Sequence, residues 1–173
     1  GVEFAETLVA AGGQVAVPTT LNVGALDLLH PDSVRADQSK ISMAKRQMDA
    51  YVSMGAEPTF TCAPYQIGHE PGVGEQVAWG ESNAIAFANS VLGARTERYG
   101  DFLDACCALT GRAPLYGLHI AKNREAKVVV DVTAVPGPLK DRDVFYPVLG
   151  TWLGLEIGRE IPLIVGLPPT VTR

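Results

Sequence analysis

Apolar and polar positions along the chain follow two periods, one typical of helices and one typical of strands. Apolar residues at helical spacing predict helices over residues 3–11, 39–54, 82–94, 102–109 and 143–157. Short apolar runs, the clearest of them rich in β-branched residues, predict strands over residues 14–17, 58–61, 77–79, 127–132 and 161–165. Helices that alternate with strands in this way predict an α/β fold with mixed, partly parallel sheets and flanking helices.

Residues 80–98, with the sequence GESNAIAFANSVLGARTER, differ from an ordinary amphipathic helix. On a helical wheel at about 100° per residue, one face holds only small side chains: Ser82, Asn83, Ala86, Asn89, Ser90 and Gly93. Solvated helix faces are usually rich in Lys and Glu, because those residues favour the helix. A face without long side chains either packs closely against another helix, with its amides hydrogen-bonded, or lets a ligand approach the backbone.

The composition is that of a globular protein and argues against several other classes. The chain has 173 residues, of which 47% are hydrophobic and 19% charged, so it has the size of one domain. With a net charge of −5, neither a nucleic acid nor an acidic membrane is an expected partner, and no apolar run reaches the length of a membrane span. Three cysteines, two of them adjacent, argue against a disulfide framework and favour a reducing compartment, so we expect a cytoplasmic protein.

Three loops follow expected strands, and in open α/β sheets ligands bind beyond the carboxyl ends of the strands. These loops are residues 19–22, 62–66 and 80–83. At the start of the helix after the third loop, Ser82 is a candidate N-cap, and the backbone N–H groups there can hold a carboxylate or a phosphate. Glu81 is a candidate for proton transfer, although a carboxylate at this position equally complements the helix dipole.

The three cysteines stand in different surroundings. Cys62 lies at the end of an expected strand, before a proline and a glycine-rich loop, and this place favours exposure at a site over burial as a small apolar residue. Cys106 and Cys107 fall inside the expected helix 102–109, where adjacent side chains point about 100° apart. They are therefore poor joint ligands for one metal group, and we interpret both as core residues.

Several basic residues are candidates for binding an anion. A guanidinium fork matches carboxylates and phosphates, and the candidates of this kind are Arg95, Arg98, Arg112 and Arg124. Arg112 and Arg124 equally suit structural ion pairs. His119 is a further candidate, to be weighed against the commoner role of a hydrogen-bonded structural histidine.

Five blocks of the sequence resemble the aconitase X family. They are VPTTLN (17–22), TCAPYQ (61–66), GESNAIAFANSVLGARTER (80–98), TGRAPLYGLH (110–119) and NREA (123–126), in the order and spacing of that family. The resemblance implies an aconitase-superfamily-like fold and an iron–sulfur dehydratase. It also implies that residues 1–173 form a single α/β segment of a catalytic domain. The remaining catalytic part of the large subunit and a small swivelling domain or subunit would then lie outside this chain.

The resemblance further implies the chemistry and the residues that carry it. The reaction is the loss of water from a small hydroxy acid, with a 2Fe–2S or 4Fe–4S cluster as Lewis acid. Cys62 takes the first cluster-ligand position, with further ligands outside the chain, and a serine of the small swivelling part is the expected base. The expected catalytic residues are Glu81, Ser82 and Asn83. The expected substrate-binding residues are Asn22, Asn89, Ser90, Arg95, Thr96 and His119.

Two substrates and two other classes of function remain open at this point. The expected substrate is cis-3-hydroxy-L-proline, which would yield pyrroline-2-carboxylate, because residues 65–75 hold no Lys or Arg for a phosphate. The alternatives are mevalonate 5-phosphate, a non-catalytic homologue that binds a small acid, and a purely structural domain. Convergence of Cys62, Asn22, Ser82 and Arg95 on one open cleft would favour the enzyme. A buried Cys62, together with a Ser82–Ser90 face packed against another helix, would remove the basis of the catalytic hypotheses.

Overall fold

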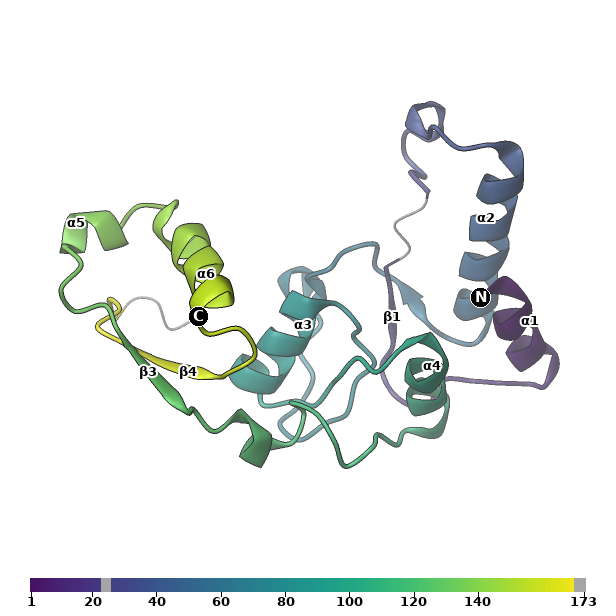
Figure 1. Ribbon diagram of the computed structural model, residues 1–173. Helices are drawn as coiled ribbons and strands as arrows, with labels where there is room; N and C mark the ends of the chain where they lie inside the picture. The colour runs from purple at the N-terminus through teal and green to yellow at the C-terminus, as the bar shows by residue number, and fades with distance from the viewer. Residues whose placement is uncertain (23–25, 170–173) are drawn as a thin grey trace. The chain divides into compact units, whose positions relative to one another are not determined.

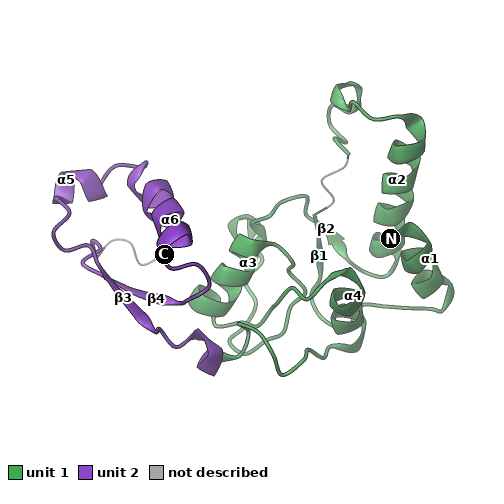
Figure 2. Ribbon diagram, in the orientation of Figure 1, with its two compact units in different colours: residues 1–120 green, residues 121–173 purple. Residues whose placement is uncertain are grey.

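The structure is a computed structural model that describes residues 1–22 and 26–169. It consists of two compact units, residues 1–120 and residues 121–173 (Figure 2). The first unit contains α1 (Val2–Ala10), β1 (Thr20–Leu21), α2 (Gln38–Ser53), β2 (Glu57–Pro58), α3 (Ser82–Phe87) and α4 (Asp101–Thr110), with 3₁₀ turns at Pro31–Ser33 and Pro64–Ile67 (Figure 1). The second unit contains a 3₁₀ turn (Ala121–Arg124), β3 (Val128–Asp131), α5 (Gly137–Lys140), α6 (Phe145–Glu156) and β4 (Pro162–Val165). The predicted α/β class with partly parallel sheets is confirmed.

Parallel pairing joins four short segments of the first unit. Strand β1 pairs with β2, and isolated parallel bridges connect the neighbouring segments. The paired residues are Thr20–Glu57, Leu21–Pro58, Thr19–Ala78 and Gln76–Arg95. Parallel segments run in one direction, so the residues that follow them, from Asn22, Gly80 and Thr96 onward, leave the sheet at the same edge.

The sequence pattern wrongly predicts a strand over residues 14–17, because strand β1 begins only after Pro18. The N–H of Val15 donates to the carbonyl of Met54 at 2.8 Å, and the N–H of Ala16 donates to the carbonyl of Ala108 at 2.7 Å. These acceptors belong to the ends of α2 and α4 rather than to a neighbouring strand. The apolar run therefore packs between two helix ends and forms no ladder.

The helix predicted over residues 82–94 is present, but it changes its winding halfway. Helix α3 is followed by a π-helical turn over Ala88–Leu92, and the chain leaves the helix at Gly93 with a φ of +71°. A π turn holds more residues than an α-helical turn, so side chains after Phe87 rotate away from their wheel positions. Ser82, Asn83, Ala86 and Ser90 are exposed as the wheel predicts, whereas Asn89 is only 3% exposed.

The hydrophobic core of the first unit lies beneath α3 and the π turn. Its buried members are Val77, Trp79, Ala84, Ala88 and Ala94, and partly buried Tyr65 and Leu92 pack against them. Ala84 and Ala88 have no exposed surface. Their methyl side chains let α3 approach the chain around Trp79 closely, which places the loop 80–83 directly above this core.

The second unit is a β–α–β arrangement with a two-stranded parallel sheet. Strands β3 and β4 pair from Val128–Pro162 to Asp131–Val165, close to the predicted strands, and α5 and α6 lie between them in sequence. The buried Lys140 donates from Nζ to the carbonyl of Gly166 at 2.6 Å. Among the described residues of both units, no helix is long and apolar enough to cross a membrane.

Candidate functional site

Two side-chain hydrogen bonds join the three loops that the sequence singles out. Asn22 donates from Nδ2 to Oε1 of Glu81 at 3.3 Å, and Asn83 donates from Nδ2 to the backbone carbonyl of Cys62 at 2.8 Å. Glu81 and Asn83 flank the first residue of α3. The loops 19–22, 62–66 and 80–83 therefore meet at the start of α3, although they are far apart in the sequence.

The loop that contains Cys62 is anchored by the residues that follow it, whereas the cysteine itself is exposed. Pro64, which begins the 3₁₀ turn after Cys62, is fully buried. The ring of Tyr65 stacks on Phe87 of α3 with centroids 3.8 Å apart, and its hydroxyl lies 3.4 Å from Nδ2 of Asn83. Sequence analysis missed this role of Tyr65, whose only signal is its place in the block TCAPYQ.

Two local predictions about this region are wrong. The N-cap of α3 is Glu81, not Ser82, and the Glu81 side chain makes no capping hydrogen bond. Cys106 and Cys107 are not core residues, because Cys106 is exposed and Cys107 is half-buried. Helix α4 fully buries only Ala108, so its two cysteines lie on faces that the amphipathic pattern assigns to the core.

Buried hydrogen bonds among Trp79, Asn89 and Thr96 connect the π turn to the sheet edge, and we call these three residues the buried lock. The Asn89 amide donates from Nδ2 to the carbonyl of Thr96 at 2.8 Å and accepts from its N–H at 3.2 Å. The Thr96 hydroxyl in turn accepts from the N–H of Trp79 at 3.1 Å and donates to its carbonyl at 2.9 Å. In this conformation both polar side chains are occupied within the fold.

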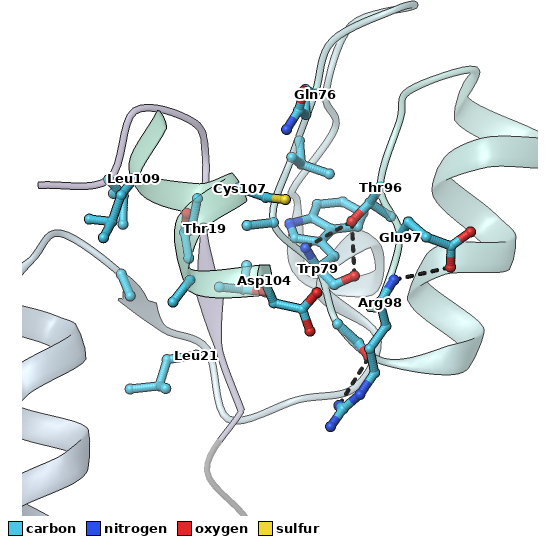
Figure 3. Close-up of a pocket in the computed structure, with 18 of the residues that line it drawn as sticks. Thr19, Leu21, Gln76, Trp79, Thr96, Glu97, Arg98, Asp104, Cys107 and Leu109 are labelled. Atoms are coloured by element: carbon cyan, nitrogen blue, oxygen red, sulfur yellow. Dashed lines mark hydrogen bonds between the residues drawn. The ribbon is translucent and has the colours of Figure 1, made fainter. Parts of the chain in front are cut away.

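A cavity of about 350 Å³ opens in the first unit between β1, α4 and the segments around Trp79 and Thr96 (Figure 3). Five predicted site residues line it: Asn22, Glu81, Arg95, Thr96 and His119. The others, Cys62, Ser82, Asn83, Asn89 and Ser90, are not among its lining residues. The predicted set thus divides into residues that line this cavity and residues that lie outside it, on α3, in the Cys62 loop and in the π turn.

The cavity carries more acidic than basic side chains. Its carboxylates belong to Glu81, Glu97, Asp101 and Asp104, against the guanidinium groups of Arg95 and Arg98. Two of these carboxylates also organise the backbone: Glu97 accepts from the N–H groups of Arg98 and Leu118, and Asp104 accepts from that of Tyr99 at 2.8 Å. Sequence analysis missed Glu97 and Asp104, since nothing in their spacing marks them.

Arg95 and His119 are placed differently within this cavity. Arg95 is exposed and donates from Nε to the carbonyl of Gly74 at 3.1 Å. This bond uses one edge of the guanidinium group, and the fork formed by the two terminal nitrogens is its other edge. His119 is buried, and its Nε2 lies 2.8 Å from the carbonyl of Pro114, the arrangement of a structural histidine.

Tyr99 lines the same cavity, and burial together with the nearby charge of Glu97 raises its pKa to about 12. Its hydroxyl donates to the carbonyl of Tyr116 at 2.6 Å. An unfolded tyrosine loses its proton at about pH 10. Between these pH values the unfolded chain holds fewer protons than the folded one, so the free energy of unfolding falls as the pH rises.

We therefore expect Tyr99→Phe to flatten the loss of stability between about pH 10 and pH 12. Urea denaturation at several pH values measures this, and ultraviolet titration of the phenols should lose its latest-ionising group in the same variant. The exposed Tyr146 provides the control, because Tyr146→Phe keeps Tyr99 and should therefore keep both the alkaline loss of stability and the latest-ionising phenol. A Tyr99→Phe variant with the same alkaline profile as the wild type would contradict the assignment.

The described residues do not by themselves fit an iron–sulfur cluster. Such clusters are held by several cysteine thiolates, and among the residues described here no group of three or more His, Cys, Asp or Glu side chains is placed to hold a metal ion. Cys62 is exposed at the loop junction, whereas Cys106 and Cys107 lie on α4.

Comparison with known proteins gives consistent matches. A family model described as the aconitase X first domain matches residues 1–122. Cis-3-hydroxy-L-proline dehydratases from Pseudomonas aeruginosa and Hypocrea jecorina are each 48% identical over 96% of this chain and 28% of their own length. The phosphomevalonate dehydratase large subunit of Thermococcus kodakarensis is 38% identical over 100% of this chain and 42% of its own length.

A solved structure gives a similar result. The crystal structure of Thermococcus kodakaraensis aconitase X in its holo-form superimposes with a TM-score of 0.72 and 37% identity, over 95% of this chain and 39% of that chain. The chain thus spans between 28% and 42% of the length of these proteins.

Proposed function

Since the chain belongs to the aconitase X family, we propose that it forms part of a hydro-lyase that removes water from a small hydroxy acid. The proposed reaction converts cis-3-hydroxy-L-proline into pyrroline-2-carboxylate. The observation that carries this choice is the 48% identity to two cis-3-hydroxy-L-proline dehydratases over 96% of the chain. The identity to a phosphomevalonate dehydratase large subunit is lower, at 38%.

The geometry supports a site at the loop junction above the core. We assign Asn22 and Arg95 to the substrate carboxylate, because both reach the cavity and carry N–H donors. Glu81, the N-cap of α3, lines the same cavity and accepts a hydrogen bond from Asn22, and its carboxylate can accept or return a proton there. Ser82, Asn83 and Ser90 would complete the polar surface on that face, and all three are exposed.

We assign Thr96, Asn89 and His119 to the support of this site. Thr96 and His119 line the cavity, but their side-chain hydrogen bonds are made to the protein backbone. Asn89 holds Thr96 in the same way. In this proposal they fix the backbone from which Arg95 projects. They position the substrate-binding residue and do not contact the substrate themselves.

A cofactor and a partner belong to the proposal as well. Cys62 would supply one ligand of an iron–sulfur cluster, whose other ligands come from outside the described residues. A small swivelling domain or subunit would complete the active site, and relatives whose names contain "large subunit" support this. All three cysteines are free in the structure, which supports the proposed cytoplasmic location.

Mevalonate 5-phosphate is the second candidate substrate, because the match to the phosphomevalonate dehydratase large subunit extends over the whole chain. The charges favour hydroxyproline. Residues 65–75 contain no Lys or Arg, and the cavity carries four carboxylates against two guanidinium groups. Such surroundings suit the ammonium group of a zwitterionic amino acid better than a phosphate dianion.

An anaerobic turnover assay tests the proposed function. The complete protein, with its partner and with iron and sulfide contents measured, is offered cis-3-hydroxy-L-proline and mevalonate 5-phosphate in parallel. Turnover of cis-3-hydroxy-L-proline supports the proposal. Turnover of mevalonate 5-phosphate instead would make that compound the substrate and overturn the choice of hydroxyproline. No turnover of either by a preparation loaded with iron and sulfide would favour a non-catalytic homologue that binds a small acid.

Arg95→Lys is expected to raise the KM for the substrate about tenfold or more, since a charged hydrogen bond contributes about 1.5–3 kcal/mol. Lysine keeps the charge but loses the two-pronged contact. Arg46→Lys is the matched control: Arg46 pairs with Glu6 on α1, away from the cavity, and this change should leave kcat and KM unaltered. Equal kinetic constants for Arg95→Lys and the wild type would remove Arg95 from the site.

A further inference from the structure

The hydroxyl group of Tyr65 lies at the loop junction, and none of the roles proposed above involves it. Tyr65 belongs to the 3₁₀ turn Pro64–Ile67, which follows Cys62 closely in the sequence. Its ring stacks on Phe87 with centroids 3.8 Å apart and 10° between the ring planes, and it packs against the buried core of the first unit. A stacked, half-buried ring has little rotational freedom, so the fold holds the hydroxyl group in one place.

The hydrogen bonds of Asn83 determine where the proton of the Tyr65 hydroxyl can point. Asn83 donates from Nδ2 to the backbone carbonyl of Cys62 at 2.8 Å. Because a carbonyl only accepts, this bond fixes which end of the Asn83 amide carries the hydrogens. The same Nδ2 lies 3.4 Å from the Tyr65 hydroxyl, whose oxygen must therefore be the acceptor in this contact. The hydroxyl group thus turns its own proton away from Asn83.

The proton of the Tyr65 hydroxyl has no acceptor among the residues that the structure describes. The contact with Asn83 is the hydrogen bond of this side chain there, and it uses the oxygen as acceptor. Asn83 and Cys62 are both exposed, so the hydroxyl group lies beside a surface that a small molecule can reach. A phenol proton in such a place donates to water or to an oxygen of a bound ligand.

We propose that the Tyr65 hydroxyl donates a hydrogen bond to the oxygen of the hydroxyl group that leaves the substrate. A small hydroxy acid offers two kinds of oxygen, those of its carboxylate and that of its hydroxyl group. Asn22 and Arg95, which we assign to the carboxylate, line the cavity, whereas Tyr65 is not among its lining residues. Tyr65 lies instead on the Cys62 side of the junction, so the leaving hydroxyl group is the oxygen that it meets. This inference rests on the proposed function and adds a residue to it.

A hydrogen bond of this kind acts mainly on the transition state. Negative charge develops on the leaving oxygen as its bond to carbon breaks, and a donor that is already in place stabilises that charge without reorganising. The Tyr65 hydroxyl is in place before the substrate binds, because stacking on Phe87 holds the ring. The contact is stronger in the transition state than in the bound substrate, so its loss lowers kcat more than it changes KM.

Tyr65→Phe in the complete protein tests this inference, because it removes one oxygen atom and keeps the ring that stacks on Phe87. We expect kcat for dehydration to fall about 10–100-fold, with KM, the iron and sulfide contents and the visible absorption spectrum unchanged. Tyr146→Phe, which removes the hydroxyl of an exposed tyrosine in the second unit, should keep the kcat of the wild type. An unchanged kcat in Tyr65→Phe would overturn the inference, and so would a loss of iron that accounts for the lower rate.

Binding of L-proline separates a direct contact from an effect on the shape of the loop. L-proline keeps the ring and the carboxylate but lacks the 3-hydroxyl group, so its Kd, measured by titration calorimetry, should be the same for the wild type and Tyr65→Phe. A Kd that rises by the factor lost in kcat would contradict the inference, since Tyr65 would then act on the whole site. The proposed function is judged in the wild type alone: a protein that does not dehydrate cis-3-hydroxy-L-proline overturns it, and this inference with it, before any variant is compared.

Discussion

Replacing Cys62, the proposed cluster ligand, by alanine in the complete protein is expected to abolish the proposed dehydratase activity and to lower the iron content. The structure makes this a clean change, because Asn83 binds the backbone carbonyl of Cys62 and not its thiol. Alanine therefore keeps the hydrogen bond that fixes the loop. Loss of a partner of a metal ligand alone costs about 10–100-fold in affinity or activity, so loss of a ligand is expected to cost more.

Cys106→Ala is the matched control for this experiment. Cys106 is also an exposed free cysteine, but it lies on α4 and outside the loop junction. Iron and sulfide analysis together with turnover should separate the two variants, with Cys106→Ala close to the wild type. Normal iron content in Cys62→Ala would remove Cys62 from the cluster, and equal iron loss in both variants would point to a general loss of folding.

Asn89→Ala is expected to lower the free energy of unfolding by about 2–4 kcal/mol, because it leaves two buried backbone groups without partners. These are the N–H and the carbonyl of Thr96, which Asn89 alone binds in this arrangement through its side chain. Alanine favours helices more than asparagine, so a few tenths of a kcal/mol are recovered. Chemical denaturation of the complete protein measures the difference.

Ser90→Ala distinguishes a specific effect of Asn89 from a general sensitivity of the π turn. Ser90 is the next residue and is exposed, so its replacement should change the free energy of unfolding by less than about 0.5 kcal/mol. An unchanged stability of Asn89→Ala, accompanied by a higher KM, would return Asn89 to the role of a substrate-binding residue, which the family resemblance implies.

The elements with strong local signals were predictable from the sequence. Helix α2 has a clear apolar period, and the run KVVVDV gives β3 its β-branched character. The run 14–17 has the same local character as a strand, yet its N–H groups bond to helix ends. Whether an apolar run joins a β-sheet depends on which segment of the chain lies beside it. The local sequence pattern does not contain that information.

The site was predictable at the level of loops but not of individual contacts. Placing loops 19–22, 62–66 and 80–83 at one sheet edge requires only the direction of short parallel segments. The partners Asn22–Glu81 and Asn83–Cys62 depend on distances between loops, which spacing along the chain does not fix. The burial of Asn89 was not predictable from a wheel of regular 100° steps, because the π turn interrupts that regularity.

The buried lock between Trp79, Asn89 and Thr96 also has a consequence for the order in which the chain folds. Its contacts join residues only 7 and 17 positions apart, and the Asn83–Cys62 contact spans 21 positions. The Asn22–Glu81 contact closes a loop of 59 residues. Short loops cost less entropy to close. We therefore expect the short-range contacts that support Cys62 and Arg95 to form first. Strand β1, which carries the chain to Asn22, would pair afterwards with a region that is already folded.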